Sequence, residues 1–185
     1  MARIHGRHAR MLVAMSAAAV AGGLLTGSVS AQPELTSYAP ITERLAFDGA
    51  VSMTVTQHLD GLDPQEVEIA DATHLTVSEV TIQPGGIFPW HTHPATVRVG
   101  IKEGDFVFVL AEDCVEREYA AGSALVDPGD TVHTAYNPSE DTETVVVATF
   151  LGAPAEGDLT LPVDANEAAA LDERCGIETP GAHAH

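Results

Sequence analysis

The chain has 185 residues, of which 27 are acidic and 8 are basic, so its formal net charge at pH 7 is −19. Hydrophobic residues make up 45% of the sequence, which excludes a disordered chain and, at this length, favours one globular domain. A surface this acidic repels phosphate backbones and anionic lipids. We therefore expect no nucleic-acid partner and no membrane-surface role.

The N-terminal segment has the pattern of an export signal. Arginines and histidines precede a short apolar stretch from Met11 to Leu25, and Val29 and Ala31 occupy the small-residue positions before a cut after Ala31. The sequence therefore predicts a signal peptide over residues 1–31, a secreted or periplasmic location, and no membrane attachment after cleavage. An uncleaved anchor is the alternative, although the apolar stretch is short for a membrane span.

Short runs of alternating apolar residues follow the signal, as is typical of strands. The clearest predicted strands span residues 74–82, 96–101, 106–110, 123–126 and 144–151. Turn signals rich in Gly, Pro, Asp and Asn fall between them, at residues 83–86, 102–105, 127–130 and 137–139. Regularly spaced short strands of this kind predict an all-β sandwich or barrel.

One short helix is predicted near the C-terminus, from Ala165 to Arg174. Asp164 can cap its first turn, and Gly176 lies just beyond its end. We divide the chain after the signal into N-terminal strands with a lead-in segment (32–72), a barrel core (73–151) and a C-terminal tail with this helix (152–185).

Cys114 and Cys175 are the two cysteines of the chain, and both follow the predicted signal. An oxidising compartment favours a single disulfide between them, which would hold the predicted helix against the barrel. Two separate thiols are the alternative. The spacing excludes a CxxC redox or zinc site.

Two segments carry the residues best suited to chemistry. In the first, His91 and His93 are two residues apart, so on a strand both imidazoles point to the same face. Paired imidazoles suit a metal ion, although a polar surface stripe is the plainer interpretation of such a pair. In the second, His133 follows a turn, and taken alone it reads as a hydrogen-bonded core residue.

Together these segments resemble the two signature motifs of the cupin superfamily. The first family motif is G-x5-H-x-H-x3,4-E-x6-G, and the matching residues are Gly85, His91, His93 and Gly104. The second is G-x5-P-x-G-x2-H-x3-N, and the matching residues are Gly122, Pro128, His133 and Asn137, with Asp130 in place of the inner glycine. The resemblance covers about residues 73–151. It implies a double-stranded β-helix, a small jelly-roll barrel, with a divalent metal ion held inside by His91, His93 and His133.

The family's usual fourth ligand, a glutamate, has no counterpart in this sequence. Counting back from Gly104 places it at Val97, which alternates with Val99 and Ile101 on one face of the predicted strand while Arg98 points the other way. The resemblance therefore implies three imidazole ligands without a carboxylate. Such a set favours zinc or copper, with iron, nickel and manganese left open.

Neighbouring polar and aromatic residues have weaker interpretations. Asp130 would suit a hydrogen bond to the second nitrogen of a ligand histidine, but a turn residue is the plainer interpretation. Trp90 should face away from the metal, because it adjoins His91 on the strand. His58 and His74 lack spaced partners and are interpreted as structural.

Three functions fit these observations. The first is an exported cupin that binds a divalent metal ion and then binds or transforms a small molecule. The second, implied by cupin dioxygenases that lack the glutamate, is a three-histidine non-heme metal dioxygenase. The third is a metal-free interaction barrel, which the three clustered histidines disfavour. The fold does not choose between an enzyme and a binding protein, and a homodimer is compatible with all three.

Overall fold

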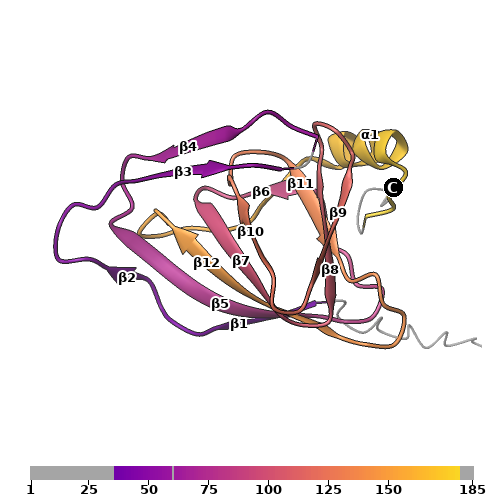
Figure 1. Cartoon of the computed structure of the whole chain (residues 1–185), viewed down its shortest axis with the longest axis horizontal. Helices are drawn as coiled ribbons and strands as arrows, with labels where there is room; N and C mark the ends of the chain where they lie inside the picture. The colour runs from indigo at the N-terminus through magenta and orange to yellow at the C-terminus, as the bar shows by residue number, and fades with distance from the viewer. Residues whose placement is uncertain (1–35, 60, 180–185) are drawn as a thin grey trace, which may run out of the picture. The chain divides into compact units, whose positions relative to one another are not determined.

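The computed structural model describes residues 36–59 and 61–179, so the predicted signal peptide lies outside the described residues. Its strands form two main antiparallel sheets and a separate hairpin (Figure 1). The first sheet has the order β1 (Thr36–Pro40), β5 (His74–Ile82), β12 (Thr144–Leu151), β7 (Thr96–Glu103) and β10 (Ala124–Asp127), with β2 (Leu45–Ala46) also paired to β5. The second has the order β13 (Leu161–Pro162), β6 (His91–Thr92), β11 (His133–Tyr136), β8 (Asp105–Leu110) and β9 (Glu116–Ala120). The hairpin pairs β3 (Met53–Gln57) with β4 (Gln65–Ile69).

This arrangement confirms the predicted all-β class and the double-stranded β-helix. The predicted strands 74–82 and 144–151 coincide with β5 and β12, and the other three predicted strands match β7, β8 and β10 to within two residues at either end. Apolar alternation did not indicate β9, because charged residues occupy three of its five positions. Within the described residues, no helix is both long and apolar enough to cross a membrane.

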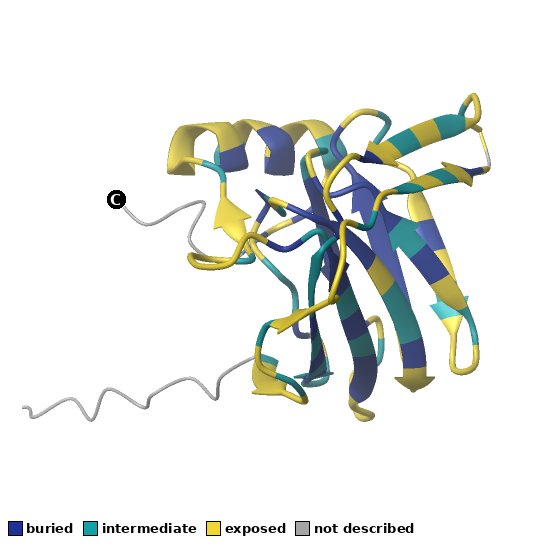
Figure 2. Cartoon of the chain, turned by 90° about the vertical axis from the view of Figure 1, so that its left-hand side faces the viewer, coloured by how far each residue is buried: buried dark blue, intermediate teal, exposed yellow. Residues whose placement is uncertain are grey.

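The main apolar core lies between the two sheets. Along β5 every second residue is buried, as a strand with one covered face requires. Its Val80 and Ile82 pack in one cluster with Phe106, Phe108 and Leu110 of β8. Figure 2 shows the same alternation of buried and less buried residues along the strands of the barrel. Burying each such side chain contributes roughly 1.5–3 kcal/mol, so this face sets the register of both sheets.

The predicted helix is present as α1 (Ala165–Cys175), which extends one residue beyond the prediction. The Asp164 side chain accepts hydrogen bonds from the backbone N–H groups of Asn166 and Glu167, which caps the first turn. Gly176 ends the helix in the left-handed conformation, with φ of 70°, and its N–H donates to the carbonyl of Asp172. Local sequence signals therefore set both ends of this helix.

Several links join α1 to the barrel, among them a disulfide and a buried hydrogen bond. Cys175 forms the predicted disulfide with Cys114, which follows β8. Trp90, buried just before β6, donates from Nε1 to Oδ1 of Asp172 at 2.7 Å. The Thr179 backbone N–H also donates to the Asp172 carboxylate, at 3.0 Å. Trp90 thus faces the helix, which leaves the neighbouring His91 to face the barrel interior, as predicted.

Loss of the disulfide should destabilise the protein. The two cysteines are separated by 61 positions, and closing a loop of this length restricts the unfolded chain by an amount worth about 2–4 kcal/mol. We expect Cys114→Ser with Cys175→Ser to lower the free energy of unfolding in urea by that amount. Two alkylatable thiols in unreduced, denatured protein would contradict the bond.

Candidate metal centre

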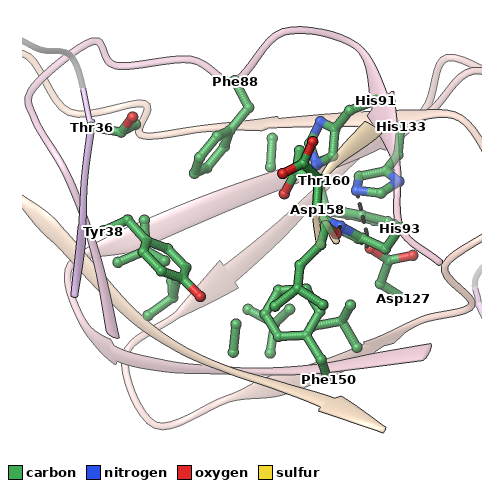
Figure 3. A pocket seen from close by; sticks show the side chains of 18 of the residues that line it. Thr36, Tyr38, Phe88, His91, His93, Asp127, His133, Phe150, Asp158 and Thr160 are labelled. Carbon is green, nitrogen blue, oxygen red and sulfur yellow. Dashed lines mark hydrogen bonds and ion pairs between the residues drawn. The ribbon is translucent and has the colours of Figure 1, made fainter. Parts of the chain in front are cut away.

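The structure brings the three histidines of the two motifs together (Figure 3). His91 lies on β6 and pairs in register with His133 on β11, while His93 follows β6 by one residue. Their ring centroids lie 4.3 to 5.1 Å apart, and one potential ligand nitrogen from each ring lies within 4.8 Å of the others. His91 and His133 are buried, and the His93 side chain is only 10% exposed. The cluster can hold a metal ion.

Each histidine ring is oriented by a main-chain carbonyl at its Nδ1 atom. The pairs are His91 with Pro89 at 2.7 Å, His93 with Leu159 at 2.6 Å, and His133 with Thr131 at 2.9 Å. A carbonyl oxygen only accepts hydrogen bonds, so each Nδ1 carries the proton and each neutral ring has its lone pair on Nε2. The three Nε2 atoms are therefore the ones available to a metal.

Asp130 has no part in orienting these rings. It is exposed in the turn after β10, and main-chain carbonyls accept the Nδ1 hydrogen bonds that Asp130 would otherwise accept. The plainer interpretation of Asp130 as a turn residue therefore holds. His58 and His74 also lie outside the cluster within the described residues.

A carboxylate that the sequence did not indicate, that of Asp127, lies beside the histidines. Its Oδ2 atom is 3.0 Å from Nε2 of His133 and 3.4 Å from Nε2 of His93. Its Oδ1 accepts the Gly129 backbone N–H at 2.8 Å. Val97, the position of the missing glutamate, is buried and apolar as expected, and it pairs in register with Asp127 across β7 and β10.

The sequence signals place Asp127 in the predicted turn 127–130 and give no sign of a carboxylate inside the barrel. The predicted strand ends at Val126, whereas β10 continues to Asp127. Leu125 and Asp127 are both buried while Val126 between them is less so, as expected for two residues on the inward face of a strand. Extending the predicted strand by one residue would have placed the carboxylate inside the barrel.

Burial dominates the electrostatics of the site. It lowers the pKa of His133 to about 3, and that of His91 to about 3 with a further contribution from the charge of His133. Burial also lowers the pKa of His93. It raises the pKa of Asp127 to about 6, although the charge of His93 opposes this shift. At neutral pH the site therefore combines three uncharged imidazoles with one carboxylate.

The histidines form one end of a cavity of about 540 Å³. Most of its wall is apolar and comes from both sheets; these residues include Val80, Phe88, Val97, Val99, Phe106, Phe108, Val146, Ala148 and Phe150. Polar residues at other points of the wall are Tyr38, Arg44, Asp158 and Thr160. The arrangement offers a cation site at one end of a largely apolar chamber, which is the usual character of a small-molecule site.

The sequence model of the cupin domain family matches residues 78–150, a range that includes all three histidines. The chain contains a cupin domain. No curated protein sequence matches it.

Several solved structures resemble parts of this cupin in fold. The polyketide cyclase RemF from Streptomyces resistomycificus is 19% identical, with 58% of this chain and 70% of that chain covered and a TM-score of 0.44. The DMSP lyase DddQ from Ruegeria pomeroyi is 20% identical, with 48% and 43% covered and a TM-score of 0.42. The protein KdgF from Halomonas sp. is 22% identical, with 43% and 70% covered and a TM-score of 0.38. The chain thus spans less than half of the lyase.

Acidification should destabilise the chelator-treated protein through the buried histidines. His91 and His133 titrate near 3 when folded and near ~6.5 when unfolded, so between these values the unfolded chain binds more protons. Their contribution to stability is fully present above pH ~6.5 and is lost as the pH falls below it. The raised pKa of Asp127 opposes this effect between the ordinary value of 3.8 and about 6, but one carboxyl group offsets only part of the effect of two histidines.

We expect the free energy of unfolding to fall by roughly 2 kcal/mol between pH 7 and pH 5 through these groups. Urea unfolding of the wild-type protein gives this net change, and comparison with the His91→Phe, His133→Phe double variant isolates the histidine part, because Asp127 and the other titrating groups are common to both. Equal pH dependence in the two proteins would contradict the assignment.

Proposed function

We propose that this chain is an exported cupin that holds a divalent metal ion through His91, His93 and His133 and presents it to a small molecule in the adjoining cavity. The observation that carries the proposal is the convergence of three Nε2 lone pairs, each directed by a main-chain carbonyl on the opposite side of its ring. Carbonyl or carboxylate bonds of this kind orient histidine ligands in metal sites generally.

The donor set fits a metal ion chemically. Imidazole nitrogen is a good ligand for zinc, copper, nickel and iron, and the nearby carboxylate oxygen widens the choice to manganese. Three imidazoles alone favour zinc or copper, and the nearby carboxylate weakens that preference. A bound divalent ion would act as a Lewis acid toward an oxygen atom of the small molecule.

The chain's own aromatic residues hold the rings in place and keep the site apolar. Phe150 meets the His93 ring edge-on, with centroids 5.3 Å apart and an interplanar angle of 84°. Phe108 lies against His133 with centroids 5.1 Å apart. Both residues also line the cavity, so they would exclude water and contact the carbon skeleton of a ligand.

Arg44 supports a ligand that carries an anionic group. It lies between β1 and β2 and lines the cavity, and its Nη2 donates to the Gly157 carbonyl at 2.6 Å. Its Nη1 is buried and has no hydrogen-bond acceptor among the described residues. A buried N–H of a guanidinium favours a carboxylate oxygen strongly, so we propose small organic carboxylates as the ligand class.

The alternatives are less well supported. A metal-free barrel would bury a carboxylate and three imidazoles with no cation among them, which is costly. The three-histidine dioxygenase follows from the missing family glutamate, and a carboxylate so close to the rings supports a site of nitrogen ligands alone less well. Export is supported by the predicted signal and by the Cys114–Cys175 disulfide, because such bonds persist in oxidising compartments.

Metal binding should require all three histidines. We expect purified protein to contain close to one equivalent of metal by elemental analysis, and His91→Ala, His93→Ala or His133→Ala to lose most of it, because each removes a nitrogen ligand. His58→Ala and His74→Ala serve as controls and should retain the metal. Full occupancy in the His133→Ala protein would overturn the site.

The ligand class is tested with metal-loaded protein and a panel of short aliphatic and aromatic carboxylates, each paired with its primary amide. We expect carboxylates to raise the melting temperature more than the amides do, and Arg44→Gln to weaken their binding at least about tenfold without changing metal affinity. Arg98→Gln, which removes an exposed arginine from the outer face of β7, is the matched control. Equal binding of acids and amides would contradict the proposal.

A further inference from the structure

We infer that Asp127 is a fourth ligand of the metal centre, supplied from β10 at the position that faces Val97 of β7. The inference rests on the proposed function, because it assumes that the histidine cluster binds a metal ion. It adds an anionic oxygen to a site for which the sequence motifs indicate nitrogen ligands alone. Figure 3 shows Asp127 on the side of His133 and His93, joined to them by dashed lines.

The hydrogen-bonding roles of the histidine rings favour a cation beside Asp127. The Nδ1 atoms of His93 and His133 both donate to main-chain carbonyls. In each neutral ring the Nε2 atom therefore has a lone pair and no proton. Each of these nitrogens nevertheless lies within 3.4 Å of the carboxylate Oδ2. Lone pairs that face one another at this distance repel unless a positive charge lies between them. The arrangement is therefore complementary to a cation.

The contact distances also match a shared coordination sphere. Donor atoms bound to one ion by bonds of about 2.1 Å lie roughly 3.0 Å apart at a right angle and about 3.4 Å apart in a tetrahedron. Oδ2 of Asp127 lies 3.0 Å from Nε2 of His133 and 3.4 Å from Nε2 of His93. Both separations therefore fit a carboxylate oxygen that shares one ion with these two nitrogens.

The backbone around Asp127 is built to hold this carboxylate in place. Gly129 donates its N–H to Oδ1 of Asp127, and its carbonyl accepts the His93 backbone N–H at 2.7 Å. Gly129 has φ of 100°, and a Cβ atom there would lie 2.3 Å from the Ala95 carbonyl oxygen, so only glycine fits this turn. One residue therefore ties Asp127 to a histidine, which leaves Oδ2 directed at the rings.

The position of Asp127 explains how Val97 can be apolar. The two residues are partners across antiparallel strands, so their Cβ atoms lie on the same face about 5 Å apart. A carboxylate from either strand would reach the same region of the barrel interior. Asp127 is 2% exposed, so its charge is held away from water beside the histidines. In this chain the carboxylate comes from β10 instead of β7, and Val97 of β7 is part of the apolar wall.

The experiment compares Asp127→Asn with Asp130→Asn in the full mature protein. Both changes remove one carboxylate, but Asp130 is exposed, and asparagine at 127 can still accept the Gly129 N–H. Zn²⁺ and Mn²⁺ affinities are measured by competition titration, and the visible absorption spectrum of Co²⁺-loaded protein reports the ligand set directly. Circular dichroism verifies that each variant is folded.

We expect Asp127→Asn to weaken metal binding by about tenfold to a hundredfold, with the larger loss for Mn²⁺. We also expect it to change the Co²⁺ spectrum. Asp130→Asn should do neither. Adding Val97→Glu to Asp127→Asn should restore a carboxylate from the facing strand and recover part of the Mn²⁺ affinity.

The outcomes separate this inference from the proposed function. If Asp127→Asn binds both metals as wild type does and leaves the Co²⁺ spectrum unchanged, while His133→Ala loses the metal, Asp127 is not a ligand and the proposed function stands. If His133→Ala also retains the metal, the proposed function fails as well.

Discussion

The site depends on where three imidazole protons are held. Main-chain carbonyls of Pro89, Thr131 and Leu159 bind the Nδ1 protons, and this directs three Nε2 lone pairs into one buried region. Lone pairs so close together, with a carboxylate beside them, favour a positive charge among them. This interior is therefore complementary to a cation, and the surrounding fold holds these groups in place.

The fold holds the histidines and Asp127 in place by using both sheets. His91 and His133 come from adjacent strands of one sheet, whereas Asp127 and Val97 come from adjacent strands of the other. The apolar packing between the sheets holds the two groups at a fixed separation, because neither strand pair can slip without exposing its buried face. The rigid apolar wall also lowers the polarity around the charges, which strengthens the attraction between a cation and its ligands.

The C-terminal segment supports the site from outside the barrel. Trp90 precedes His91 on the chain and is held by Asp172 of α1, and the Cys114–Cys175 disulfide fixes the end of the same helix. The loop before β13 contributes the Leu159 carbonyl to the His93 ring. The orientation of the histidine rings therefore depends on residues well beyond the matched family range of 78–150.

The sequence by itself determined the strands, the helix ends and the choice of histidines, because these features follow from residue spacing along the chain. Alternation located β5 and β12, Asp164 and Gly176 set the ends of α1, and motif spacing selected the three histidines. These signals are local, because a strand's faces and a helix's caps follow from positions a few residues apart.

Only the tertiary structure decided which polar groups meet inside the barrel. Asp127 reads as a turn residue until the pairing of β10 with β7 places it beside the histidines, and Leu159 orients His93 from 66 positions away. Such partners are set by strand register and by the course of a distant loop. Alternation over residues 125–127 can assign Asp127 to the inward face of its strand, but which groups it meets there depends on how the whole chain packs.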